Sequence, residues 1–231
     1  MPGWQELATR EESRYRDGES RLGTERDRDS RQRQLTRMGN AAGGVALASL
    51  MLGDHAAATE WLARAAERYR ESYDDAPPGS WGRPIGAMKA RILAGDWEAA
   101  AADAAWALDE GAASAESPIG RYAACLALLV LGRWEEARVL ADEVRTHEGF
   151  PSDVGDALAG IAAQDAIGYT EAIESVLSSF ETRDEYLEDV PVADTVIVLQ
   201  ALAARRGIDV ELESPLLPGS RREEGFDPLS R

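Results

Sequence analysis

The sequence predicts an all-α protein built from a row of helical hairpins. Apolar residues recur at helical spacing from about residue 38 onward, and Gly or Pro interrupts this pattern about every 15 to 20 residues. Sustained alternation of apolar and polar residues, which would indicate strands, does not occur before the C-terminal end. The chain has 231 residues, 44% of them hydrophobic, so it is long and apolar enough to bury a core.

Four short segments repeat one pattern, in which a glycine is followed by polar residues and then by a small or apolar residue. Their glycines are spaced by 42, 37 and 36 residues, and prolines lie between the units. In each unit we expect a first helix to end at the glycine, which can adopt the left-handed C-cap conformation. A second helix then begins with acidic residues near its positive end. The four glycines are Gly53, Gly95, Gly132 and Gly168.

Two of these segments, Gly-Asp-Trp-Glu-Ala-Ala at 95–100 and Gly-Arg-Trp-Glu-Glu-Ala at 132–137, resemble the tetratricopeptide repeat. The resemblance covers about residues 38–190. It implies a right-handed solenoid of helical hairpins, whose first helices line a curved face that binds peptides or partner proteins. The sequence departs from the family's pattern where an aromatic residue is missing at two positions and a small residue at a third: His55, Thr170 and Ile173.

The charge pattern divides the chain into three parts. Residues 1–37 contain nine arginines and eight acids and are predicted to form a charged helix or a partly disordered arm. Residues 38–207 are expected to form the helical-repeat domain, which ends in a C-terminal capping helix. Residues 208–231 are expected to be an extended tail. The stretch 205–218 also resembles the end of a bacterial immunity-protein family, whose members are helical.

The chain is strongly acidic, with 42 acidic and 25 basic residues and a formal net charge of −17. This charge opposes binding to nucleic acid and to anionic membranes, so we expect neither as a partner. Lys89 is the only lysine and alanine is abundant, a composition typical of high-GC genomes. The acidity therefore has two interpretations: adaptation to a salt-rich cell, or a surface that serves function.

Neither a targeting segment nor a membrane span is evident in the sequence. The first residues lack a basic stretch that leads into an apolar run, and no apolar stretch approaches the ~20 residues that a span requires. We therefore expect a cytoplasmic protein.

Residue types that carry catalysis or bind metals form no recognisable constellation. The two histidines, His55 and His147, are far apart in the sequence, and the single cysteine, Cys125, lies in an apolar stretch typical of a buried position. We therefore predict that the protein is not an enzyme and requires neither a metal nor a cofactor.

A modest cationic and aromatic set on the predicted first helices marks a candidate partner-binding face. Its members are Asn40, Trp81, Arg83, Lys89, Arg121 and Tyr122. In the alternative interpretation, the two aromatic residues fill space between repeats and the arginines neutralise neighbouring acids.

Two functions follow from these patterns. The first is a non-catalytic interaction scaffold or adaptor, which binds a peptide, a partner protein or another copy of itself on the first-helix face. The second is an immunity-type inhibitor of a toxin enzyme, which the acidic surface and the C-terminal resemblance favour.

Overall fold

The computed structural model describes residues 3–23 and 27–219, and these residues form ten α-helices and no strand. The prediction of an all-α fold is therefore confirmed for them. In chain order the helices are α1 (Trp4–Leu22), α2 (Arg28–Leu52), α3 (His55–Tyr73), α4 (Gly82–Leu93), α5 (Trp97–Asp109), α6 (Pro118–Val130), α7 (Trp134–Arg145), α8 (Ser152–Ala163), α9 (Ala166–Glu181) and α10 (Asp194–Arg205). Two short 3-10 helices are η1 (Ala112–Ser114) and η2 (Leu187–Asp189).

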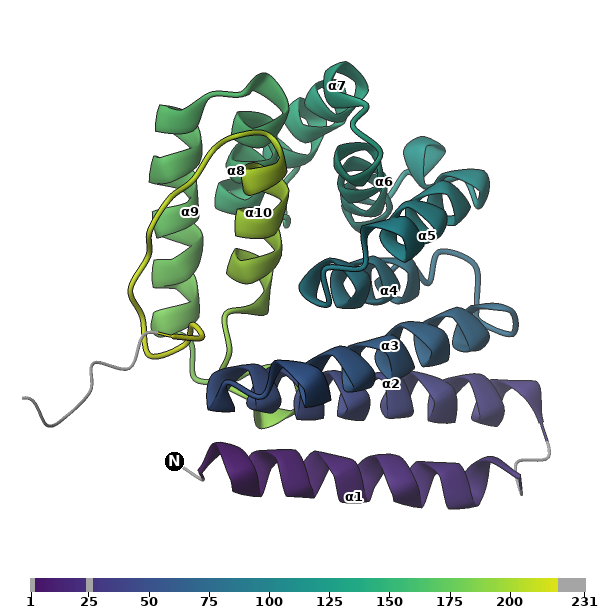
Figure 1. The fold of residues 1–231 in the computed structure, drawn as a ribbon. Coiled ribbons are helices and arrows are strands. Elements are labelled where there is room, and N and C mark those ends of the chain that lie inside the picture. The colour runs from purple at the N-terminus through teal and green to yellow at the C-terminus, as the bar shows by residue number, and fades with distance from the viewer. Residues whose placement is uncertain (1–2, 24–26, 220–231) are drawn as a thin grey trace, which may run out of the picture.

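Helices α1, α2 and α3 form a layer of long antiparallel helices at one end of the molecule (Figure 1). The charged N-terminal segment is part of this layer, because it forms α1 and the first turns of α2. Asp27 starts α2 by accepting a hydrogen bond from the backbone N–H of Ser30. Helix α2 then continues without interruption across residues 37 and 38, so the structure has no break at the boundary expected there.

The glycines of the first three units end the first helices as predicted. Gly53, Gly95 and Gly132 have φ angles of 76°, 70° and 72° and follow α2, α4 and α6. These values lie in the left-handed region, which glycine adopts without the steric cost that other residues pay. Asp54 and Asp96 then start α3 and α5, since their side chains accept hydrogen bonds from backbone N–H groups of the following turn.

The fourth unit begins four residues earlier than the sequence pattern predicts. Gly168 lies in the first turn of α9, so the prediction that it ends a first helix is wrong. The break occurs at Gln164, whose φ of 56° is left-handed, and Asp165 then caps α9 by accepting from the N–H of Gly168. A glutamine at the left-handed position and an aspartate cap produce the same turn that Gly-Asp produces earlier, so a pattern defined by glycine does not include it.

This shift places a large residue where the other units have alanine. Tyr169 takes the position of Ala58, Ala100 and Ala137, and it is fully buried. The space for it comes from α8, because a Cβ atom on Gly160 would lie 2.9 Å from the backbone nitrogen of Tyr169. In this unit the small residue at the contact is therefore Gly160 of the facing helix, α8.

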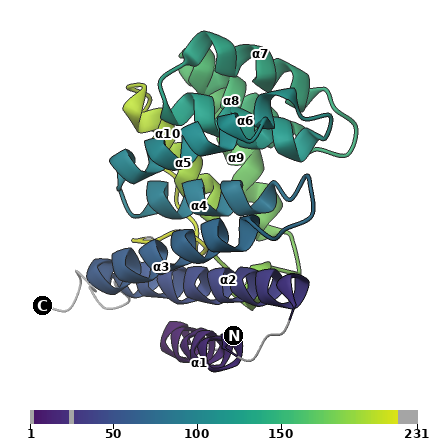
Figure 2. The same cartoon turned by 90° about the vertical axis from the view of Figure 1, so that its right-hand side faces the viewer.

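Helices α4 to α9 continue from this layer as an arc in which each helix packs against the next (Figures 1 and 2). Helix α10 lies on the inside of the arc and contacts α4, α8 and α9. It was expected to cap the end of the row; instead it returns along the row as far as α4. The physical reason is its apolarity, since Val196, Leu199 and Leu202 are almost completely buried there.

The turns of three hairpins meet the last turn of α10. The guanidinium of Arg205 lies 4.3 Å from the ring centre of Trp97, and that of Arg206 lies 4.7 Å from the ring centre of Trp134. The side chain of Gln164 donates a hydrogen bond of 3.0 Å to the carbonyl of Arg206. Aromatic and polar residues at equivalent turns thus hold α10 in place.

The buried apolar residues form two clusters that meet at α4. One cluster joins α1 to α4, and the other joins α4 to α10. Residues 208–214 have no helix or strand and residues 215–219 form turns, and this segment packs on the second cluster through Ile208, Leu216 and Leu217. Within the described ranges, every helix is either too short or too polar to cross a membrane.

Candidate functional site

A cavity of about 340 Å³ lies between α2, α3 and α4, where the two apolar clusters meet. Its walls are mainly apolar, and η2 and the first residue of α10 complete its rim with two carboxylates, Glu188 and Asp194. This volume falls in the range of roughly 300–1,000 Å³ that is typical of ligand pockets. The apolar side chains of the wall include Leu47, Leu62, Ala65, Ile85 and Leu93.

The side chain of Tyr69 reaches this cavity through a slot between two glycines. A Cβ atom on Gly39 of α2 would lie 3.0 Å from its ring, and one on Gly86 of α4 would lie 2.7 Å from it. Burial, together with the negative charges of Asp194 and Glu188, raises the pKa of Tyr69 above its ordinary value. The hydroxyl is therefore protonated at neutral pH and available as a donor.

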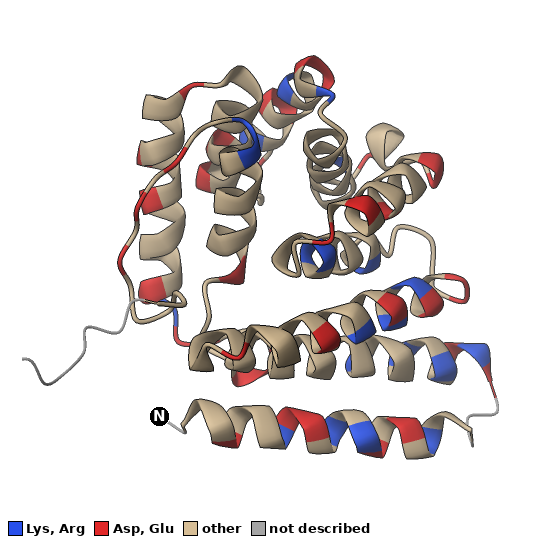
Figure 3. Cartoon of the chain, in the orientation of Figure 1, with Lys and Arg blue, Asp and Glu red and all other residues tan. Residues whose placement is uncertain are grey.

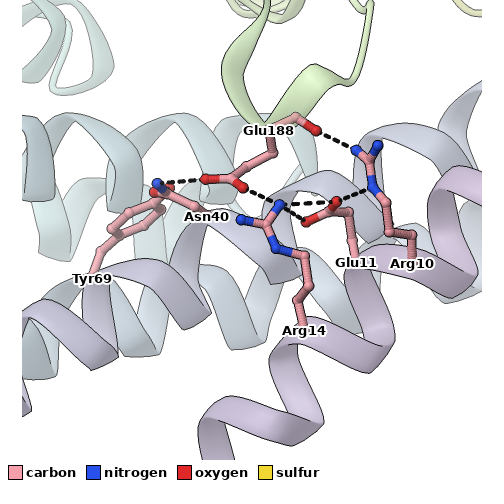
Figure 4. A network of polar contacts seen from close by, with 6 residues as sticks. All are labelled: Arg10, Glu11, Arg14, Asn40, Tyr69 and Glu188. Atoms are coloured by element: carbon pink, nitrogen blue, oxygen red, sulfur yellow. Dashed lines mark hydrogen bonds and ion pairs between the residues drawn. The ribbon is translucent and has the colours of Figure 1, made fainter.

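Tyr69 begins a chain of polar contacts that runs along the rim of the cavity (Figure 4). Its hydroxyl donates to Oδ1 of Asn40 over 2.8 Å, and Nδ2 of Asn40 donates to Glu188 over 3.2 Å. The carboxylate of Glu188 also pairs with Arg14, and its backbone carbonyl accepts from Arg10. A single residue of η2 thus connects α1 with α2.

Glu188 is held in an unfavourable backbone conformation by these contacts. Both Glu188 and Asp189 have a φ of 55°, in the left-handed region that residues with a side chain seldom occupy. The arginines that hold Glu188 are themselves fixed by a fully buried carboxylate, because Glu11 pairs with Arg10 and Arg14 at 2.7 and 3.0 Å.

A second polar link crosses the cavity rim between α4 and α10. The ammonium of Lys89 lies 2.5 Å from the carboxylate of Asp194 and donates to the hydroxyl of Thr195 over 3.1 Å. At the start of α4, Arg83 donates to the hydroxyl of Ser72 over 3.1 Å and to the side-chain oxygen of Gln32. These bonds tie α4 to α3 and α2 on one side and to α10 on the other.

The structure brings together three of the six residues that the sequence singled out. Asn40, Arg83 and Lys89 line the cavity. The other three do not reach it. Trp81 is buried against α6, where a Cβ atom on Gly120 would lie 2.7 Å from its ring nitrogen.

The remaining two residues lie on α6. The buried ring of Tyr122 packs beside Phe150, with 5.4 Å between ring centres. Arg121 pairs with Glu143 of α7 and donates to the carbonyl of Ala115 over 3.1 Å. Trp81, Tyr122 and Arg121 thus fill space and neutralise a neighbouring acid, in agreement with the alternative interpretation for these three.

Sequence reasoning missed Tyr69, Glu188 and Asp194 as parts of the site. Tyr69 belongs to a second helix, α3, whereas the predicted binding face consists of first helices. Glu188 is 148 residues from Asn40 in the sequence, and no local pattern indicates that they meet.

Charge is distributed very unevenly about this cavity. Residues 1–93 contain 14 acidic and 15 basic residues, whereas residues 94–219 contain 25 acidic and 7 basic ones. Most of the blue residues in Figure 3 accordingly lie on α1 to α4. The cavity lies at the border between the balanced part and the acidic part.

The cavity contains neither a cluster of metal-binding side chains nor the cysteine thiol, over the described residues. Over residues 3–23 and 27–219, no three His, Cys, Asp or Glu side chains are close enough to hold a metal ion. Cys125 is buried in α6, and burial raises the pKa of its thiol to about 12, so the thiolate is not formed at neutral pH.

Comparisons of the chain with protein-family models, with curated proteins and with solved structures found no match. The resemblances to tetratricopeptide repeats and to immunity proteins therefore stay predictions.

Proposed function

We propose that the protein is a non-catalytic interaction scaffold that holds a segment of a partner protein in the cavity between α2, α3 and α4. The observation that carries this proposal is the cavity itself. The first helices α2 and α4 line it, its wall is mainly apolar, and α10 contributes only Asp194 to it. An apolar cavity with a few polar groups at its rim is the usual form of a binding site.

The architecture that we propose for this scaffold is a right-handed, tetratricopeptide-like solenoid. Its support is the succession of hairpins α2–α3, α4–α5, α6–α7 and α8–α9, with left-handed turn residues at equivalent places. In such a solenoid the first helices face the concave side, where partners bind. Helix α10 takes up much of that side, so the end near α2 and α4 is the part available to a partner.

Gly43 offers a way to fill the cavity without disturbing the fold. It lies within α2 on the cavity wall, and a Cβ atom added there would have no atom within 4 Å. Replacing a glycine inside a helix also removes a penalty of about 1 kcal/mol. Gly43→Leu should therefore fold and occupy the cavity, and Gly43→Ala is a matched control that leaves most of the space empty.

The test is a selection of peptides from a random displayed library on the wild-type protein, followed by calorimetry. The selected peptides should share an apolar residue and bind Gly43→Ala as they bind the wild type. Their affinity for Gly43→Leu should be lower by about tenfold or more. Failure to enrich any peptide, or equal affinity for Gly43→Leu and the wild type, would contradict the proposal.

An immunity-type inhibitor of a toxin enzyme is the second candidate. The excess of acidic residues over residues 94–219 favours it, because such a surface attracts a basic partner. A partner of this kind would bind less tightly as salt increases and would be insensitive to Gly43→Leu. These two responses distinguish it from the scaffold.

A further inference from the structure

The cavity rim carries four charged side chains, and three of them have a partner of opposite charge. Lys89 pairs with Asp194, and Glu188 pairs with Arg14. Arg83 has hydrogen bonds to the hydroxyl of Ser72 and to the amide oxygen of Gln32, both neutral groups. Among the residues whose positions are described, no carboxylate lies within ion-pair distance of Arg83. The rim therefore has one positive charge that is not compensated.

The direction of the pKa shift of Arg83 agrees with the lack of a carboxylate partner within ion-pair distance among the described residues. Burial lowers the pKa of Arg14 and of Arg68, but their contacts, including those with Glu11 and Glu71, outweigh burial and raise the pKa overall. The pKa of Arg83 is lowered, since burial disfavours its charge and the opposing effect of Tyr73 is smaller. A guanidinium stays charged at neutral pH all the same, so Arg83 is a partly buried cation.

Arg83 and the leucines of the wall lie at opposite ends of the cavity. Helices α2 and α4 run in the same direction (Figure 1), and the bond from Arg83 to Gln32 joins their N-terminal ends. Leu93 follows Arg83 by ten residues, which is ~15 Å along a helix. The cavity thus has a cationic end and an apolar end.

We infer that the segment held in this cavity carries an acidic side chain next to its apolar anchor. The carboxylate faces Arg83, and the apolar group lies against Leu47, Leu62 and Leu93. This inference rests on the proposed function and specifies the partner that the same site recognises. Arginine has five N–H donors, of which the bonds to Ser72 and Gln32 use two, so donors remain for a carboxylate.

The acidity of the whole protein does not prevent this interaction. Residues 1–93, which supply nearly all of the cavity wall, carry almost equal numbers of acidic and basic residues. Charges on the distant helices are screened over about 8 to 10 Å at physiological salt. The contact with Arg83 is local and is screened less.

Two dyes with one ring system separate the charge from the apolar body. 8-Anilinonaphthalene-1-sulfonate is anionic, and N-phenyl-1-naphthylamine is the same molecule without the sulfonate. Fluorescence titration should show that Arg83→Gln weakens binding of the anionic dye about tenfold and leaves the neutral dye unchanged. Arg83→Lys, which keeps the charge, should retain most of the affinity for the anionic dye, and Gly43→Leu should weaken both dyes.

The selected peptides supply the second arm, because they test a protein segment rather than a free anion. Asp or Glu should be enriched within two residues of the shared apolar residue, and replacing it by Asn or Gln should weaken binding to the wild type but not to Arg83→Gln. Peptides that bind at the cavity without an acidic residue would overturn this inference and leave the proposed function standing.

Two further outcomes separate the two proposals. If Arg83→Gln changes the affinities of both dyes equally, the preference for an anion is wrong. If the anionic dye binds at the cavity but no peptide is enriched, the ligand is a free amphiphilic anion, and the scaffold function is overturned.

Discussion

Residues 1–93 and residues 94–219 bury their helices by different means. The first part packs helices that are rich in both signs of charge, and it even buries a carboxylate, Glu11, between two arginines. The second part packs helices mainly through alanine and leucine, and α10 fills its interior. Most of its acids are not buried, and the exception is Asp103, which pairs with Arg70 of the first part. Small apolar side chains allow helices to approach closely, whereas a polar contact fixes the distance and angle between the groups that it joins.

The difference explains why the cavity lies where the two parts meet. Polar contacts bridge this border, namely those of Lys89 with Asp194 and of Asn40 with Glu188. They hold the two parts together at defined points but do not fill the volume between α2, α3 and α4. A cavity at such a border leaves the two apolar clusters on either side of it in place.

The largest expected contrast concerns truncation of leucine in the two regions. Leu126 is completely buried in α6, and Leu62 of α3 borders the cavity. Leu126→Ala should lower the free energy of unfolding by about 4 kcal/mol and Leu62→Ala by about 2 kcal/mol, because Leu62, although buried, faces the cavity on one side. Urea unfolding followed by circular dichroism measures both. Equal losses would show that the border is packed as tightly as the arc.

A smaller contrast is expected for alanine at two glycines that line the cavity. Gly86→Ala would place a Cβ atom 2.7 Å from the Tyr69 ring, and overpacking of this kind should lower stability by about 2 kcal/mol. Gly43→Ala adds its methyl group to open space and should raise stability by about 0.5 to 1 kcal/mol. Thermal unfolding distinguishes the two signs. A stabilised Gly86→Ala would mean that Tyr69 is not confined by its slot.

The same substitution in two tyrosines compares the regions directly. The Tyr69 hydroxyl donates to Asn40, so Tyr69→Phe should cost about 1 kcal/mol. The Tyr169 hydroxyl is buried in the arc without a hydrogen-bond partner in the described part of the chain, so Tyr169→Phe should raise stability by about 1 kcal/mol. Denaturant unfolding of both variants tests this, and a destabilised Tyr169→Phe would indicate a partner for that hydroxyl.

The last expected effect is a loss of stability at alkaline pH. Burial raises the pKa values of Tyr69, Tyr122 and Tyr169 above the ordinary value of 10.0. Above pH 10 the unfolded chain releases protons that the folded state retains, so the contribution of these groups is complete below pH 10 and is lost as the pH rises beyond it. Unfolding measured between pH 8 and 11 should show this decline, and Tyr169→Phe should make it less steep. If Tyr169→Phe leaves the dependence of stability on pH unchanged, Tyr169 does not contribute to the alkaline loss.

Much of the hairpin pattern was predictable because its causes are local. A glycine that ends one helix and an aspartate that starts the next act within a few residues, so Gly53 and Gly95 could be recognised by spacing alone. The position of the fourth turn was not predictable from glycine, since Gln164 adopts the left-handed conformation that glycine adopts in the other units. The same physical requirement can be met by more than one residue type.

The candidate site was only half predictable. Asn40, Arg83 and Lys89 could be found because they belong to the cationic and aromatic set on the predicted first helices, two of which line the cavity. Tyr69 could be placed on a helix but not in the slot between Gly39 and Gly86, because that slot exists only after three helices have packed. The place of Glu188 in the site was not predictable, because its contact with Asn40 joins residues that are 148 positions apart in the sequence.

The amino-acid sequence by itself determined that the chain is helical, where three of its hairpins turn, and that charge divides it unequally. These properties arise from side chains within a turn or two of one another and from composition. The tertiary structure alone decided that α10 returns to the inside of the arc, that Glu188 and Asp194 reach α2 and α4, and that a cavity remains between them. Those features depend on how much apolar surface each arrangement buries over the whole molecule, a quantity that no short segment contains.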